Sequence, residues 1–240
     1  MGWKSYRVEF GDRNLRPDEM ASQSQVPHLK IRDEVSALKR ERTIGAAVDL
    51  FYEHGYENTT LDAVAEQLGV TKPFIYANFG SKGELLAEIC SRGIASALEA
   101  IDSVLGMRAS ATESLAELSR RFVTAVLRYQ KHIAIYTREE KNLVAEDARR
   151  IGEMRREFDA KLTKLLERGV ASGEFHIKDA RMAALSIGGM VSWAYVWYRP
   201  KGRLKLSEVA EHMTELILAL AGAGSAEPAV KPRAARTRAK

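Results

Sequence analysis

Residues Thr60–Phe79, with the sequence TLDAVAEQLGVTKPFIYANF, decide the fold of the N-terminal part of this chain. Their first half carries apolar residues at the spacing of one helix face and ends at Gly69, which tolerates the left-handed backbone that closes a helix. Thr60 and Thr71 stand where an N-capping hydroxyl is favoured, one before each half. Pro73 falls in the first turn of the second half, where its missing N–H costs little. The stretch therefore predicts a helix-turn-helix.

The second helix of this pair is expected to be exposed along most of its length. Ile75 and Phe79, four residues apart, point back to the first helix. The other side chains are small, apolar or hydrogen-bonding, and such a surface suits the major groove of DNA, where base edges present donors, acceptors and thymine methyls. The residues expected to face outward are Lys72, Pro73, Phe74, Tyr76, Ala77 and Asn78.

Further short motifs surround this stretch at one continuous spacing. Ala46–Phe51 and Gly55-Tyr56 precede it, Ala65–Val70 lies within it, and Ser81-Lys82 with Leu85-Leu86 follow it. Together these motifs resemble the DNA-binding domain of the TetR family of repressors. The resemblance implies a homodimer that binds a palindromic operator in double-stranded DNA and is released by a small-molecule effector.

The resemblance also implies roles for individual residues. The positions that match phosphate contacts are Thr60, Tyr76 and Lys82. The positions that match contacts to base edges are Thr71, Lys72, Pro73 and Phe74. Lys72 is expected to donate a hydrogen bond to guanine. The alternative is that Lys72 is only a solvated lysine on the surface. Asn78 departs from the histidine that many family members carry there, so its contact to DNA stays open.

Apolar residues recur at helical spacing along most of the remaining chain, and no segment alternates as a strand does. The sequence therefore predicts an all-α protein of about nine helices, with a three-helix bundle that contains the helix-turn-helix and a larger helical domain. The helices expected outside the helix-turn-helix span residues 36–54, 82–104, 112–130, 132–142, 146–171, 179–198 and 206–222.

These boundaries divide the chain into four segments. Residues 1–35 mix acidic and basic side chains without a sustained period and are expected to be a disordered or loosely ordered extension. Residues 36–82 form the predicted DNA-binding domain, and residues 83–222 the helical ligand-binding and dimerisation domain. Residues 223–240 are expected to be a basic, disordered tail.

The segment 179–198 is apolar on two opposite sides and must be covered on both. The family resemblance implies that this helix and 206–222 form a four-helix contact between two protomers, and burial inside one protomer is the alternative. The residues expected in the dimer interface are Gly188, Val191, Tyr195, Val209, Met213, Leu216, Ile217 and Leu220.

A pocket for the effector is expected among the helices between residues 82 and 198. Its candidate lining residues, for each of which a core position is the alternative, are Tyr129, Tyr136, Met154, Phe158, Trp193 and Trp197. Ile135–Glu140 and Trp197–Pro200 resemble a subgroup that responds to acyl-CoA thioesters from lipid, sterol or aromatic catabolism. The basic residues considered for the CoA phosphates are Arg120, Arg121 and Arg128. A drug- or metabolite-responsive repressor of an efflux or biosynthetic operon is the alternative.

Composition constrains the function less than the motifs do. The net charge is +5, but residues 225–240 carry five basic residues against one acidic residue, while 36–90 carry eight acidic and five basic. Cys90 is the single cysteine, so an intramolecular disulfide is impossible, which fits a reducing cytoplasm. The N-terminus lacks the apolar stretch of a signal peptide, and the longest apolar run, 183–198, falls short of the ~20 residues that cross a bilayer. No membrane association is expected.

An enzyme is not expected, because the chain contains none of the motifs G-x-S-x-G, Walker A, H-E-x-x-H or G-x-G-x-x-G. The five histidines are scattered without metal-ligand spacing, and no cofactor is predicted. Two other classes remain as alternatives. One is a metal sensor that uses His132 with Glu139 or Glu140, and the other is a helical module that binds only proteins.

Overall fold

The computed structural model describes residues 26–223, with side chains from residue 33 onward. Every regular element in this range is helical, so the all-α prediction is confirmed. The helices are α2 (Val26–His54), α3 (Leu61–Leu68), α4 (Lys72–Phe79), α5 (Lys82–Leu105), α6 (Ala111–Arg128), α7 (Gln130–Glu139), the 3-10 turn η1 (Glu140–Asn142), α8 (Ala145–Ala171), α9 (Ala180–Ser192), α10 (Ala194–Trp197) and α11 (Leu206–Leu220).

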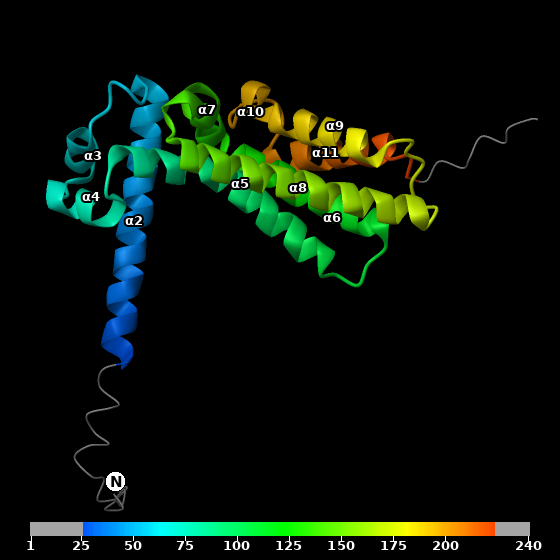
Figure 1. The fold of residues 1–240 in the computed structure, drawn as a ribbon, viewed down its shortest axis with the longest axis horizontal. Coiled ribbons are helices and arrows are strands. Elements are labelled where there is room, and N and C mark those ends of the chain that lie inside the picture. Colours follow the sequence, from blue (N-terminus) through cyan, green and yellow to red (C-terminus); the bar gives the residue numbers. More distant parts are fainter. Residues whose placement is uncertain (1–25, 224–240) are drawn as a thin grey trace, which may run out of the picture.

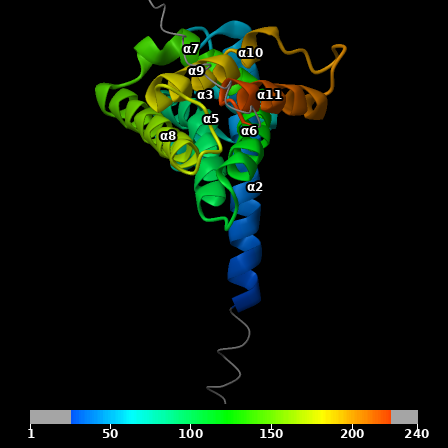
Figure 2. The same ribbon diagram turned by 90° about the vertical axis from the view of Figure 1, so that its right-hand side faces the viewer.

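The helices form a small bundle and a larger body. α2, α3 and α4 lie at one end of the molecule, and α5 to α11 extend away from them (Figure 1). α5 connects the two parts, because it begins beside the small bundle and then runs along α6 and α8. In the view turned by 90°, α8 and α11 flank α5 and α6, which lie between them (Figure 2). A movement of α5 therefore reaches both parts.

Two clusters of buried side chains hold these parts together. One joins α2, α3 and α4 to the first turns of α5, and it also contains Ile135 and Tyr136 of α7 and Ile151 of α8. The other fills the space between the rest of α5 and α6, α8, α9 and α11. Ile94 packs against both clusters. The first turns of α5, assigned from the sequence to the larger domain, thus share the core of the small bundle.

The first described helix is longer than expected. α2 begins at Val26 rather than near Ser36, and Pro27 stands in its first turn, where proline is tolerated. Its residues 33–39 are all exposed, including the apolar Val35 and Leu38, so this part of α2 packs against no core. Residues 26–35, expected to belong to a disordered or loosely ordered extension, thus continue α2 as a helix. The rest of that extension, together with nearly all of the predicted basic tail, lies outside the described residues.

Candidate DNA-binding surface and effector cavity

The α3–α4 pair forms the predicted helix-turn-helix. The Thr60 hydroxyl accepts a hydrogen bond from the Ala63 amide at 3.1 Å and so caps α3, which leaves its O–H free to donate. Gly69 ends α3 with a φ of +65°. Thr71 occupies the N-cap position of α4, but its hydroxyl caps no amide, contrary to the prediction. This hydroxyl is exposed at the front of α4.

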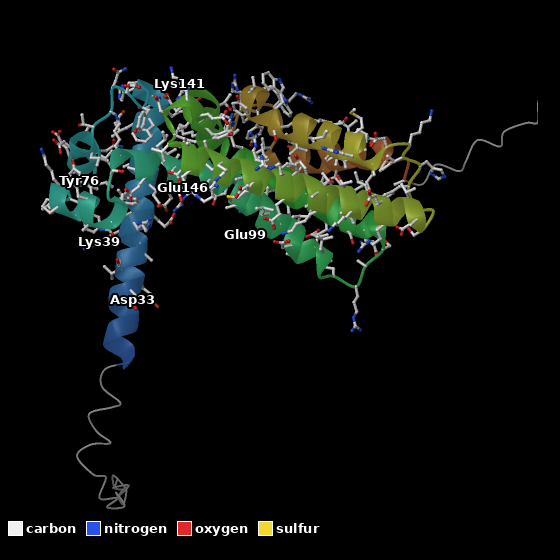
Figure 3. All side chains as sticks on the ribbon, viewed as in Figure 1. Asp33, Lys39, Tyr76, Glu99, Lys141 and Glu146 are labelled. Atoms are coloured by element: carbon white, nitrogen blue, oxygen red, sulfur yellow. The ribbon has the colours of Figure 1, made fainter. Side chains whose placement is uncertain are left out.

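The front and outer side of α4 are open to a ligand. Lys72 and Pro73 are exposed, and Tyr76 is 53% exposed on the side of α4 that points away from the larger body (Figure 3). The Lys72 ammonium contacts the Asp62 carboxylate of α3, and this hydrogen bond raises the pKa of Lys72. Asp62 therefore holds the Lys72 ammonium close to the first helix.

Phe74 and Asn78, expected to face outward, are only half exposed. Phe74 packs against the buried cluster of the small bundle, with the Lys39 ammonium 5.8 Å from its ring centre. The Asn78 amide donates to the Phe74 carbonyl at 2.8 Å, and the Asn78 carbonyl accepts from Arg40. The two residues are four positions apart on a two-turn helix, so they share the side that faces α2. Asn78 closes the end of α4 instead of reaching outward.

Lys82 is held in place at the start of α5. Its ammonium lies 4.2 Å from the centre of the Tyr56 ring and donates to the Glu57 carbonyl at 3.4 Å. The ring of Tyr56 in turn packs edge-on against Phe51, with 5.3 Å between ring centres. Tyr56 is thus a positioning residue for Lys82 that was recognised from the sequence only as part of the Gly55-Tyr56 motif.

An ionic network joins α5 to the end of α4 through α2. Arg92 of α5 donates to both oxygens of the Glu41 carboxylate at 2.7 Å and to Glu88 at 3.0 Å. Glu88 also contacts Arg40 of α2, which donates to the Asn78 carbonyl of α4. Arg92 and Glu88 are each less than one quarter exposed, and the bonds to Glu41 raise the pKa of Arg92. The bidentate Arg92–Glu41 pair and the pairs that share Glu88 hold the three helices in a defined arrangement better than single surface ion pairs would.

A cavity of about 380 Å³ lies among α5, α6, α7, α8 and α9. Most of its wall is apolar. The lining residues are Cys90, Gly93, Ile94, Ala97, Phe122, Val126, Ile133, Tyr136, Ile151, Arg155, Phe158, Asp159, Leu185, Gly188, Gly189 and Ser192. The four residues from α5 include Gly93, the direct neighbour of Arg92. The cavity therefore shares a helix with the ionic network.

Only two of the six predicted lining residues, Tyr136 and Phe158, contribute to this cavity. The Tyr136 hydroxyl donates to Glu140 at 2.7 Å, while the Arg155 guanidinium lies 5.0 Å from its ring centre. Sequence periodicity identified these helices but not which of their faces meet. The residues that lie elsewhere are Tyr129, Met154, Trp193 and Trp197.

The arginines considered for CoA phosphates do not lie at this cavity either. Arg120 pairs with Glu211, and Arg121 with Glu117. Arg121 and Arg128 line a separate hollow between α5 and α6. The arginine that sequence reasoning missed is Arg155, which is exposed and borders the apolar wall.

α9, α10 and α11 present an exposed apolar face, on which Trp193, Trp197 and Leu216 line one shallow hollow. Trp193 is 61% exposed, Leu216 59% and Leu220 42%. The remaining exposed apolar side chains of α9 and α10 are Met182, Leu185, Val196 and Trp197. Leu216 and Leu220 were predicted to face a partner, whereas the tryptophans were assigned to the pocket.

For the other predicted interface residues, the structure favours different positions. Val191, Val209, Met213 and Ile217 are buried in the core of their own protomer, Gly188 lines the cavity, and Tyr195 is half-buried. The reason is that both helices are apolar on two sides, and the chosen side packs inside the protomer against neighbouring helices such as α6 and α8. The exposed face is the opposite one.

Two family models match the chain. One describes bacterial regulatory proteins of the tetR family and covers residues 44–89, and the other describes the tetracyclin repressor-like C-terminal domain and covers residues 108–221. The transcriptional repressor KstR2 of Rhodococcus jostii (strain RHA1) is 30% identical over 187 residues, which are 75% of this chain and 89% of that repressor. This chain belongs to the TetR family. The resemblance inferred from the motifs is confirmed, and the chain is a DNA-binding transcriptional regulator.

Two solved structures share the fold of this TetR-family chain. PfmR from Thermus thermophilus is 29% identical with a TM-score of 0.68, and the match covers 74% of this chain and 97% of PfmR. AibR, solved in complex with isovaleryl coenzyme A and operator DNA, is 26% identical with a TM-score of 0.63. That match covers 74% of this chain and 96% of AibR.

The metal-sensor alternative has no support in this TetR-family regulator. Within residues 26–223, no three histidine, cysteine or acidic side chains come together as a metal site. Glu139 instead accepts a hydrogen bond from Asn142 at 2.9 Å. In the same part of the chain, no helix has the length and apolar character needed to span a membrane.

Proposed function

We propose that this TetR-family regulator is a repressor that binds a palindromic operator as a dimer and releases it when a small molecule enters the cavity. The observation that carries this proposal is that α5 borders the cavity at Gly93 and is tied through Arg92 to the helices that present α4. Ligand entry and operator binding would thus act on one helix. The proposed phosphate contacts are Thr60, Tyr76 and Lys82, and the proposed base contacts are Thr71, Lys72 and Pro73.

The exposed apolar face supports a two-fold dimer. A monomer rarely leaves several large apolar side chains exposed together, and such patches commonly mark protein interfaces. A two-fold contact through this face would place two recognition helices on successive half-sites of a palindrome. The residues that would bury this surface are Met182, Leu185, Trp193, Val196, Trp197, Leu216 and Leu220.

For the effector, we propose an acyl-CoA thioester whose acyl part enters the cavity. AibR, which shares this fold, binds isovaleryl coenzyme A. Pockets for small molecules span about 300–1,000 Å³, so a cavity near the lower end suits the acyl part and leaves the CoA outside. Arg155 is exposed and borders the cavity, so its guanidinium could bind a phosphate or carbonyl of the CoA part that stays outside the cavity.

Release would follow from a change in the spacing of the two α4 helices. An operator favours one spacing, so a small rotation of α5 that moves the small bundle weakens binding to both half-sites. The Arg92 network would transmit this rotation from the cavity to the end of α4.

The first test is a gel shift with the purified chain and DNA from upstream of its own gene. Retardation that is reversed by acyl-CoA thioesters supports the whole proposal. If hydrophobic drugs release the DNA and no thioester does, the effector is a drug-like molecule instead. The apolar wall of the cavity suits such a molecule equally well. Absence of retardation on this DNA and on bound genomic fragments would contradict operator binding.

Lys72→Ala is expected to change which sequence is bound rather than how tightly DNA in general is held. A lysine that donates to one guanine contributes about 1–3 kcal/mol of discrimination against other bases. Selection of operators from a randomised library should therefore lose the preference for guanine at one position of each half-site. A solvated Lys72 would leave the selected sequence unchanged.

Arg92→Ala is expected to reduce the coupling between effector and operator. Allosteric coupling typically changes affinity about 5- to 150-fold, and loss of the network should bring this factor closer to one. The measurement compares decanoyl-CoA affinity in the presence and absence of operator, by titration calorimetry. Arg128→Ala is the control, because Arg128 is exposed on α6 and does not join the network. Equal coupling in the two variants would contradict this route.

A further inference from the structure

One carboxylate interrupts the apolar wall of the cavity. Asp159 of α8 lines it together with Phe122, Phe158 and Leu185. The Asp159 side chain faces α9 where that helix has glycine, since a Cβ added at Gly188 would lie 3.8 Å from Oδ1. The absence of a side chain at Gly188 leaves space in front of the carboxylate.

This carboxylate has no partner among the described side chains. Among residues 33–223, no group donates a hydrogen bond to the Asp159 carboxylate, and no basic side-chain nitrogen lies within 4 Å of it. By contrast, Asp102 contacts Lys161, and Glu174 accepts from the Ala111 and Thr112 amides. Partial burial raises the pKa of Asp159, and the Arg155 charge opposes this rise. Because Asp159 is only partly buried, its carboxylate is open to a ligand and can accept a hydrogen bond from one.

The neighbouring arginine does not neutralise Asp159 directly. Arg155 lies one helical turn earlier, but its guanidinium is directed to Tyr136, with 3.4 Å to the hydroxyl and 5.0 Å to the ring centre. Its positive charge nevertheless disfavours a second cation beside Asp159. A neutral donor such as a hydroxyl suits the site better than an ammonium group.

We propose that Asp159 accepts a hydrogen bond from a hydroxyl group on the buried part of the effector, so that the cavity selects hydroxylated apolar ligands. This inference rests on the proposed effector role of the cavity. A hydrogen bond to a charged group strengthens binding about tenfold to a hundredfold over a ligand that leaves the carboxylate unpaired.

Binding of matched ligands tests the selection. The probes are decanoyl-CoA, 3-hydroxydecanoyl-CoA and 10-hydroxydecanoyl-CoA, with decanoic and 10-hydroxydecanoic acids as CoA-free counterparts. We expect at least one hydroxylated probe to bind the wild-type dimer about tenfold more tightly than its unsubstituted counterpart. Asp159→Leu should abolish this preference while retaining or improving the affinity for the unsubstituted probe. Asp102→Asn, which alters an exposed and paired carboxylate, is the control and should keep the preference.

The outcomes separate this inference from the proposed function. Binding of decanoyl-CoA without any preference for a hydroxyl would overturn the role of Asp159 and leave the thioester effector standing. A preference seen only with the free acids would remove the thioester and keep the role of Asp159.

A ligand-free measurement decides the matter if no probe binds. Asp159 makes no side-chain contact that holds the fold together, so Asp159→Leu and Asp159→Asn should each leave Tm unchanged or raise it. A lower Tm in both variants would show that Asp159 serves the fold itself and would overturn the inference.

Discussion

Trp193→Glu is expected to convert the protein to a monomer and to abolish operator binding at concentrations that saturate the wild type. Trp193 is 61% exposed on the apolar face that also contains Leu216 and Leu220. A carboxylate there would be taken out of water when the partner covers this face, and the loss of its hydration would cost several kcal/mol. Since each protomer holds one recognition helix, loss of the dimer also removes the second half-site contact.

Sedimentation equilibrium at micromolar concentration and operator titration are the measurements. Val144→Glu is the matched control, because Val144 is equally exposed but lies between η1 and α8, away from this face. The control should remain a dimer with normal operator affinity. A Trp193→Glu variant that stays dimeric would show that the protomers meet elsewhere.

Ile217→Glu distinguishes the two sides of α11. Ile217 is fully buried inside the protomer, so a charge there should unfold the chain and not merely separate two folded copies. Circular dichroism would show lost helicity for Ile217→Glu and retained helicity for Trp193→Glu. This contrast tests the choice of the exposed side as the interface.

Lys82→Ala is expected to weaken binding to every DNA sequence, by at least about tenfold for a dimer that loses two phosphate contacts. The ammonium is held by Tyr56 and Glu57 at the start of α5, so little side-chain freedom is lost when DNA binds. The slope of log affinity against log salt should fall by about 0.9 for each lost contact. Tyr76→Ala should also weaken all binding, but its phenol is uncharged, so we expect its main effect on affinity and a smaller one on the slope.

Fluorescence anisotropy at several salt concentrations measures both quantities. Lys178→Ala is the control, because it removes the same charge from an exposed position just before α9, at the far end of the larger body from α4 (Figure 1). The control should change neither affinity nor slope beyond the small effect of net charge. Wild-type affinity and slope in both the Lys82 and Tyr76 variants would contradict the proposed DNA-binding surface.

The DNA-binding motif could be predicted from the sequence because its signals are local. The Thr60 cap, the left-handed Gly69, the early Pro73 and the apolar pair Ile75 and Phe79 lie within a few residues of the structure they specify. The all-α class could be predicted for the same reason, since helical periodicity needs no knowledge of distant contacts.

Only the tertiary structure decided how the faces of these helices are used. Val191 and Trp193 are almost adjacent and both apolar, yet one is buried in the protomer and the other exposed. Phe74 and Asn78 face α2 because of the way α4 packs against that helix. Asp159 has open space in front of its carboxylate only because α9 places Gly188 opposite it. Periodicity specifies that a helix has an apolar side, whereas which side meets which neighbour depends on the packing of residues far apart in the chain.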